Sequence, residues 1–489
     1  MVRIPMCYRR HSAITAVLAV FVPLYLCGFR ASAQENPAAH EASPPANPAR
    51  QLSLSLPPGR VITLREAIDL ALRVHPSELQ ARANVDVTAA RVEEARSGYL
   101  PQVSASAIYE RTTGNVAIRP GFNTSQGSTS TTGAASATPL PSTSWNPSFN
   151  SYNFTASAAQ LIYDFGQTSG RWRASEETAA SAVSSEKGVQ IQLVSNVRRA
   201  YFQARAQKDL IVVAAHNLLN QERHLEQIVG LVEQGMRPEI DRVTAETNVA
   251  NARVQLISAQ NNFAVACATL GQTIGVSAGA SFLPADDEMG PVPEEGAPLD
   301  RLLALALQQR PEVASFEEQR RAQEQTIRSA LGGYGPAVSA QASLNEQGIA
   351  LESTSSRPGL EPNWWAGVVL TWQLYQGGLT AGQVREARAT LRSIAAQEEA
   401  FKLQVRVDVE TASLAVKAAR ETLDAAQIAL QNSGKQLELA ESRYGVGMGS
   451  VIELGDSQVT ETTAEAQVVN ARYNLAGARA ALLGALGRQ

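Results

Sequence analysis

The chain repeats its own sequence pattern over most of its length. Residues 299–346 follow the pattern of residues 64–110 at one constant spacing, and a second constant spacing relates the segments that follow. Two long copies of one pattern predict two copies of one structural unit, placed side by side around an axis. The spacing is too wide for the short repeats of a solenoid. Matched pairs include Pro76 with Pro311, Tyr163 with Tyr375, Gly235 with Gly447, and Gly275 with Gly487.

The N-terminal segment has the features of an export signal. Three arginines precede an apolar stretch over residues 14–26, and a small-residue cleavage site ends at Ala33. We therefore predict a signal peptide over residues 1–33. Its apolar stretch of roughly 13 residues is too short for a membrane anchor. Cys27 follows Leu26 instead of a small residue, which argues against lipidation of the N-terminus.

The composition of the remaining chain limits its partners. Removal of the signal takes away four arginines and no acids, so the mature protein is more acidic than the formal net charge of −4. We expect no nucleic-acid partner, because binding phosphates needs a basic face. Cys267 is the only cysteine left, which excludes an intrachain disulfide. Residues 34–62 are rich in Pro and Ala and are expected to form a flexible lead-in.

Each repeat is expected to open with two short helices. Thr63 followed by Glu66 predicts a capping box, and a proline interrupts each copy near its start. Helix then resumes until a Gly-Tyr-x-Pro sequence prevents its continuation. We place the first repeat at residues 63–275, a linker at 276–298 and the second repeat at 299–489.

Four segments alternate apolar and polar residues with the period of two that predicts β-strands. A soluble hairpin with one buried face is the simpler interpretation. However, strands of roughly ten residues are long enough to cross a bilayer when tilted, and aromatic residues lie near their ends as in a membrane-interface belt. Four strands cannot close a barrel in lipid, so they must be shared among subunits. The strands are expected at about 102–111, 149–163, 337–345 and 364–375, with interface aromatics Tyr109, Tyr152, Tyr163, Trp364, Trp365, Trp372 and Tyr375.

A long helix follows each strand pair. Residues 167–234 contain no proline, and a helix of that length reaches roughly 100 Å. Apolar residues recur every seven positions, which predicts a left-handed coiled coil with a returning helix. The hairpins are expected to turn at 234–238 and 445–450. The expected seams are Val197, Ala204, Ile211, Leu218, Leu225 and Val232 against Thr247, Ala250, Val254, Ile257, Asn261, Ala264 and Ala268 in the first repeat, and Val409, Val416, Leu423, Leu430, Leu437 and Tyr444 in the second.

Because these sequence features occur together and in this order, the chain resembles the TolC family of outer-membrane channel proteins over almost all of its mature length. The shared marks are the duplication, the Gly-Tyr-x-Pro junctions, the Tyr-x-x-Gly strand exits and the sequence from Tyr444 to Asp456. The resemblance implies a mainly α fold with a membrane β-barrel portion. In it, a homotrimer forms a twelve-stranded outer-membrane barrel, four strands per subunit, on a periplasmic α-helical barrel.

The same resemblance implies a function and a location. Such proteins lie in the outer membrane of Gram-negative bacteria, in contact with its lipid, and extend into the periplasm. They are the exit duct of a tripartite efflux pump or type I secretion system. Their partners are a periplasmic adaptor (membrane fusion protein) and an inner-membrane transporter. That transporter selects the cargo, so drug, metal and polypeptide remain open here.

By resemblance, residues at the hairpin turns narrow the periplasmic end of the pore. Glu453 and Asp456 lie on one helical face and match the family's paired acids, and Asp241 is the first-repeat equivalent of Glu453. Tyr444 matches a tyrosine that helps hold the closed mouth, but Gly449 stands where its arginine partner is expected. Two solvated acids near a helix N-terminus are the alternative interpretation. The expected adaptor-docking residues, whose glycines also serve the turns, are Gly235, Met236, Val446, Gly447 and Met448.

No residue set predicts bond chemistry, so we expect no enzyme, no catalytic residue, no metal site and no cofactor. The segment 445–450 lacks the preceding strand and the last glycine of a dinucleotide-binding loop. The histidines are scattered, and His216 and His224 are expected on helix surfaces. The alternative function is a structural periplasmic coiled coil or an adaptor without a channel. An adaptor carries one hairpin flanked by β domains, whereas two hairpins are predicted here.

Overall fold

The computed structural model describes residues 59–113, 148–276, 282–351 and 361–488. The predicted signal peptide, its cleavage site and all but the end of the predicted lead-in lie outside these residues. Within them, no helix combines the length and the apolar character needed to cross a membrane.

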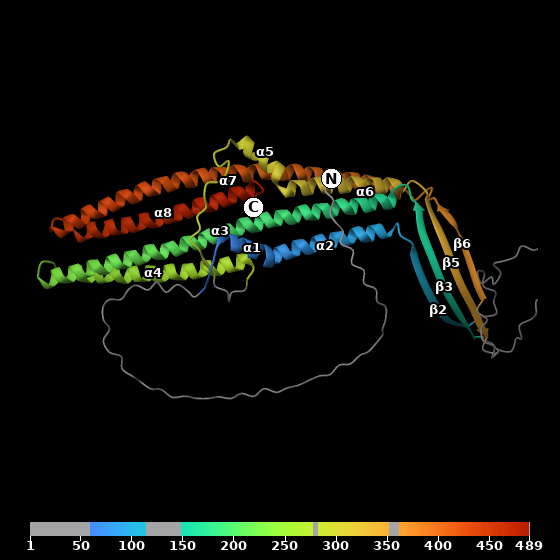
Figure 1. The fold of residues 1–489 in the computed structure, drawn as a ribbon, viewed down its shortest axis with the longest axis horizontal. Helices are drawn as coiled ribbons and strands as arrows, with labels where there is room; N and C mark the ends of the chain where they lie inside the picture. The colour runs from blue at the N-terminus through green and yellow to red at the C-terminus, as the bar shows by residue number, and fades with distance from the viewer. Residues whose placement is uncertain (1–58, 114–147, 277–281, 352–360, 489) are drawn as a thin grey trace, which may run out of the picture. The chain divides into compact units, whose positions relative to one another are not determined.

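Both repeats contain the same elements in the same order (Figure 1). Each long helix has 67 residues, and the returning helices have 36 and 35. The capping box at Thr63 is confirmed, since its hydroxyl accepts from the N–H of Glu66 at 3.3 Å. The first repeat consists of α1 (Leu64–Val74), α2 (Pro76–Ser97), β2 (Gln102–Thr113), β3 (Ser148–Tyr163), α3 (Gln167–Glu233) and α4 (Glu239–Ile274). The second consists of α5 (Leu299–Gln309), α6 (Pro311–Gly332), β5 (Ala337–Leu351), β6 (Glu361–Thr371), α7 (Leu379–Gly445) and α8 (Val451–Ala485), and a parallel pair of short strands, β1 (Arg60–Ile62) and β4 (Phe282–Pro284), accompanies them.

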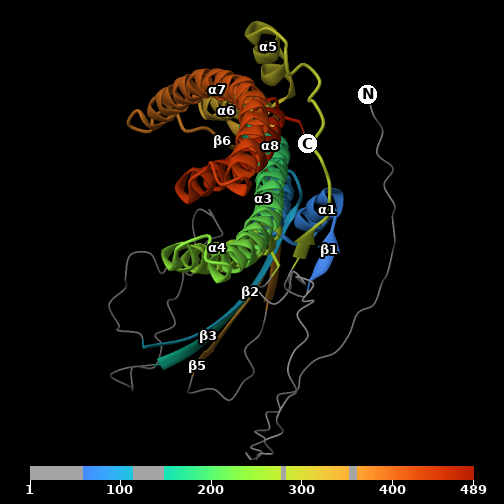
Figure 2. The same ribbon diagram turned by 90° about the vertical axis from the view of Figure 1, so that its left-hand side faces the viewer.

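Two continuous helices, α3 and α7, run the whole length of the helical layer. Toward the sheet they pack with α2 and α6, and toward the hairpin turns they pack with α4 and α8. Figure 2 shows α7, α8, α3 and α4 side by side in a curved layer. Because α3 also packs against α6 and α8 of the second repeat, the two repeats share one seam.

The shorter helices are stacked end to end beside α3 and α7. Gly275 ends α4 with a φ of 91°, and a Cβ there would lie 2.8 Å from the Cα of His75, the residue that caps α2. Gly487, just after α8, stands in the same relation to Arg310 before α6, at 3.0 Å. Only glycine combines this left-handed backbone with such a close contact. Each repeat is therefore one unbroken helix beside a column of two stacked helices.

The predicted seam of α7 is confirmed, whereas that of α4 is wrong. Val409 and Val416 of α7 are buried. In α4, however, Val254 and Ile257 are 61% and 58% exposed. This helix carries two apolar stripes, and the seven-residue period alone does not say which one faces α3. The face that does so contains Ala245, Ala252, Leu256, Phe263 and Cys267.

The four long strands form one antiparallel sheet in the order β2-β3-β5-β6. Within the described residues, the outer strands β2 and β6 each pair on one side only. The last strand begins and ends earlier than predicted, so Trp372 and Tyr375 lie beyond it. The sheet thus has two edges whose backbone N–H and C=O groups need partners.

One face of this sheet is apolar and the other is polar, as the alternation predicted. The polar face includes Ser104 and Ser157, whose hydroxyl oxygens are 2.8 Å apart. Trp365 stands in the same polar row, beside Ser343. Two adjacent rows of the apolar face are Val103, Ala158, Ala342 and Ala366, and Ala105, Ala156, Leu344 and Trp364.

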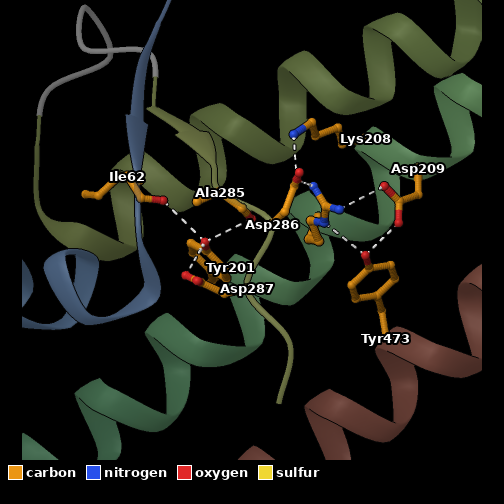
Figure 3. A network of polar contacts seen from close by, with 9 residues as sticks. Ile62, Tyr201, Lys208, Asp209, Ala285, Asp286, Asp287 and Tyr473 are labelled. Carbon is orange, nitrogen blue, oxygen red and sulfur yellow. Dashed lines mark hydrogen bonds and ion pairs between the residues drawn. The ribbon is translucent and has the colours of Figure 1, made fainter. Parts of the chain in front are cut away.

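A polar network ties the linker between the repeats to the helices (Figure 3). The hydroxyl of Tyr201 in α3 lies 2.9 Å from Oδ2 of Asp287. Arg205 donates from Nε to the hydroxyl oxygen of Tyr473 in α8 at 3.0 Å. Burial, with help from the carboxylate of Asp209, raises the pKa of Tyr473 to about 12, so this phenol stays protonated at neutral pH. The other members of the network are Ile62, Lys208, Ala285 and Asp286.

Candidate functional site

The two hairpin turns have the same backbone. At each turn the N–H of a methionine donates to the carbonyl oxygen five residues earlier at 2.9 Å, and the glycine before it has a φ of 72° or 77°. This bonding needs a left-handed residue, which glycine supplies without steric cost. The side chains of the turns point largely into solvent. The structure places all five predicted docking residues here, with exposed side chains on Met236, Val446 and Met448.

Gly449, where the family resemblance suggested an arginine, lies tightly against the second turn. A Cβ at this position would lie 2.8 Å from the backbone nitrogen of Tyr444. An arginine therefore does not fit there unless the turn moves. The equivalent residue of the first turn, by the same repeat spacing that relates Gly235 to Gly447, is Arg237.

Tyr444 lies between the two hairpins and is 6% exposed. The guanidinium carbon of Arg237 is 4.5 Å from the centroid of its ring, and the ring centroid of His224 is 5.5 Å away. Within the described part of the chain, its hydroxyl oxygen is buried without a hydrogen-bond partner. Burial raises the pKa of Tyr444, with Arg237 opposing this shift and Asp241 adding to it. Tyr444 therefore contacts Arg237 and His224 through its ring and not through its hydroxyl group.

His224 is buried, which corrects its expected place on a helix surface. The helix α3 is covered on one side by α4 and on a second side by α8 of the other hairpin. Across this second contact, Nε2 of Gln221 donates to Oε1 of Gln458 at 3.0 Å. Burial lowers the pKa of His224, so its imidazole is neutral at pH 7. His216 is exposed, as expected.

Glu453 and Asp456 line one open groove of about 880 Å³ beside the second turn. Oε1 of Glu453 lies 2.8 Å from Nη1 of Arg443, and both side chains are partly exposed. Lys435 lines the same groove, which therefore contains two acids and two cations of one chain. Asp241 is not among the residues lining this groove, and instead lies near Tyr444 at the start of α4.

The predicted interface aromatics lie toward the two ends of the sheet, except for Trp364 and Trp365, whose rows (Leu344 and Ser343 of β5) are about midway between the rows of Tyr163 and Tyr152. Trp364 belongs to the apolar face, but its neighbour Trp365 belongs to the polar face. The two tryptophans therefore cannot contact the same environment. Nearest the helices are Tyr163, Trp372 and Tyr375, and farther from them are Tyr109 and Tyr152.

In the residues that the structure describes, no three His, Cys, Asp or Glu side chains are arranged to hold a metal ion. Cys267 is buried, and burial raises its pKa to about 11. Its thiol is therefore protonated and poorly nucleophilic at neutral pH.

A sheet with one apolar face, joined to long helical hairpins, defines a class of membrane protein with a helical extension outside the bilayer. The family model for outer membrane efflux proteins matches residues 67–276 and 302–488. The chain therefore belongs to the outer membrane efflux protein family. This confirms the predicted TolC-like resemblance, the outer-membrane location and the role in efflux.

Individual relatives are distant in sequence and close in fold. The chain is 22% identical to the outer membrane protein TolC of Escherichia coli K12, over 82% of this chain and 77% of that protein. It is 25% identical to the pyoverdine export outer membrane protein OpmQ of Pseudomonas aeruginosa, over 71% and 72%. Its fold is similar to the crystal structure of the Campylobacter jejuni CmeC outer membrane channel. That match has a TM-score of 0.70 at 17% identity and covers 87% of this chain and 85% of that one.

Proposed function

We propose that three copies of this chain form the outer-membrane exit duct of a tripartite efflux pump or type I secretion system. The observation that carries the proposal is the four-stranded sheet with one apolar face and two edges that are unpaired within the described residues. Such edges are costly in lipid, so neighbouring copies must supply the missing strands. Because β2 and β6 run in opposite directions, joining β6 of one copy to β2 of the next continues an antiparallel barrel of twelve strands.

The dimensions of the sheet fit a bilayer. About ten residues of β5 separate the row of Tyr163 from the row of Tyr152, which is about 33 Å along the strand. At the tilt of 35–45° found in such barrels, this corresponds to a height of about 25 Å, the height of their apolar band. Val103 and Trp364 of the apolar face are 77% and 74% exposed. These side chains would contact lipid, and the polar face would line the passage.

The helical layer also has unpartnered apolar residues on its two outer helices. Val254 and Ile257 of α4 are exposed, and Leu403, Leu414 and Ile428 of α7 are 59–67% exposed. The layer ends at these helices, so α4 of one copy is free to pack against α7 of the next. That packing would close a periplasmic α-helical barrel around the axis of the β-barrel.

The hairpin turns would form the periplasmic mouth of the duct. Two carboxylates from each subunit, Glu453 and Asp456, would meet at a narrow point and favour cations. Asp241 would contribute less, since it lies beside Tyr444. The exposed methionines at the turns are adaptable surface for a periplasmic adaptor.

Cross-linking across the sheet edges tests the assembly. Variants that carry one cysteine on β2 and one on β6 should give disulfide-linked dimers and trimers under mild oxidation in the membrane. As a control, Ala156→Cys with Leu344→Cys joins register partners of the central strands, so it should cross-link within one chain. Cross-linked dimers and trimers from the Ala156→Cys, Leu344→Cys variant would contradict the proposed barrel. So would a result in which every variant with cysteines on β2 and β6 runs only as a monomer.

Single-channel conductance in a planar bilayer tests the mouth. The parent should conduct weakly and prefer cations. Glu453→Gln combined with Asp456→Asn should raise the conductance and weaken the cation preference. An unchanged conductance would remove these acids from the constriction without affecting the assignment of the barrel.

A further inference from the structure

The two turns each hold one half of an aromatic–cation pair. The second turn has Tyr444 and, five residues later, Gly449, which carries no side chain. The first turn has Arg237 at the position equivalent to Gly449, and Val232 at the position equivalent to Tyr444. Neither hairpin can make the contact by itself.

The structure brings these two halves together. The guanidinium carbon of Arg237 lies 4.5 Å from the ring centroid of Tyr444, well inside the roughly 6 Å range of a cation–π contact. The ring is buried where the two hairpins meet, beside His224 of α3. The phenol oxygen has no partner among the described residues, so the contact depends on the ring and not on the hydroxyl group. Gly449 leaves no room for a competing side chain near Tyr444.

We propose that Arg237 is the positioning residue that holds the first hairpin turn against the second through the face of the Tyr444 ring, and thereby keeps the periplasmic mouth closed. This inference rests on the proposed function, because it names a contact that holds that mouth. The contact is made within each subunit, so all three subunits carry it. Moving the two turns apart requires breaking it.

A set of single variants in the full-length protein tests the proposal by conductance. Arg237→Gln should raise the ratio of open to closed states by about threefold to thirtyfold for each subunit, the range expected for loss of one cation–π contact. Arg237→Lys should retain most of the closed state. Tyr444→Leu should open the channel as Arg237→Gln does, and the two changes together should add little. Tyr444→Phe should behave like the parent, because it keeps the ring.

The matched control is Arg242→Gln. Arg242 lies in the first turn of α4 and pairs with Glu239 of the same helix, so its loss removes one cation near the same turn and leaves the Arg237–Tyr444 contact in place. Its conductance should remain that of the parent. Trimer recovery and thermal unfolding of each variant would show that the duct still assembles, and Tyr444→Phe and Arg237→Lys are mild enough to assemble in any case.

Each outcome decides the proposal. Closed behaviour of Arg237→Gln, or equal opening by Tyr444→Phe and Tyr444→Leu, would overturn it, the latter because a hydroxyl contact would then hold the turns. Failure of the duct itself is a different result. A parent protein that never conducts, even with Glu453→Gln and Asp456→Asn, would contradict the proposed function rather than the role of Arg237.

Discussion

The two hairpin turns share a backbone and differ in their side chains. Both end a 67-residue helix with the same hydrogen bond from a methionine and the same left-handed glycine. The first turn then presents Arg237 and Pro238, whereas the second presents Gly449 and the helix cap Ser450. The two repeats thus have the same backbone at their turns but different side chains at equivalent positions. As a result, a side chain of the first turn contacts a side chain of the second.

The largest expected effect comes from breaking what the repeats share, the end-to-end stacking of helices. Gly275→Ala should lower the free energy of unfolding by about 2–4 kcal/mol, because it strains a left-handed backbone and crowds His75. Gly487→Ala should have a similar, slightly smaller effect, since its contact is looser. Thermal unfolding would measure both. The control Gly230→Ala lies in open space within α3, and it should leave stability equal or higher.

A smaller effect is expected where the turns differ. Gly449→Ala places a Cβ against the backbone of Tyr444, so the second turn should lose about 1–3 kcal/mol of local stability, and the first turn, coupled to it only through Arg237, should lose less. Amide hydrogen exchange of residues 440–455 and 228–243 would measure the two turns separately. Gly445→Ala meets nothing within 4 Å and should change little. Equal loss at both turns would show that they open as one unit.

The contact between the hairpins should weaken in acid. Burial lowers the pKa of His224, so above its unfolded pKa of about 6.5 the imidazole is neutral in both states. As the pH falls below that value, the unfolded form takes up the proton more readily, and the packed form loses stability. Hydrogen exchange of the amides near residue 224, corrected for intrinsic rates, should therefore become faster as the pH is lowered from about 7.5 to 5.5. His224→Gln should abolish this dependence, and His216→Gln should retain it.

The smallest effect is expected from the ion pair beside the second turn. Glu453 and Arg443 are 39% and 56% exposed, and such pairs contribute about 0–1 kcal/mol. Glu453→Gln should therefore alter local exchange only slightly, and the difference should vanish near 1 M salt, where the screening length is about 3 Å. A large change that persists in high salt would mean that Glu453 supports the turn by other contacts.

Local periodicity explains which parts of the fold could be predicted. The period of two in the strands and the period of seven in α7 depend on neighbours within one segment, so both were found from the sequence. The face of α4 that meets α3 was not found, because Val254 and Ala252 lie on two stripes of similar apolar character. Burial of His224 was also missed, since it depends on α8, whose sequence is more than 200 residues away.

The same distinction holds at the site. Turn glycines such as Gly447 could be located because only they adopt the required backbone. The neighbours of Tyr444 could not, since Arg237 belongs to the other hairpin and no local pattern links them. The pairing of Arg443 with Glu453 across one turn was also missed, because heptad positions describe the seam between helices and not the side chains that border the groove.

The stacked columns also govern how force passes along the molecule. At Gly275 and Gly487, the end of one helix rests against the start of another with no peptide bond between them, so these joints resist compression better than twist. Only α3 and α7 are covalently continuous from the turns to the sheet. Torque between the turns and the strands therefore passes through unbroken backbone in these two helices, and through the stacked columns by side-chain packing.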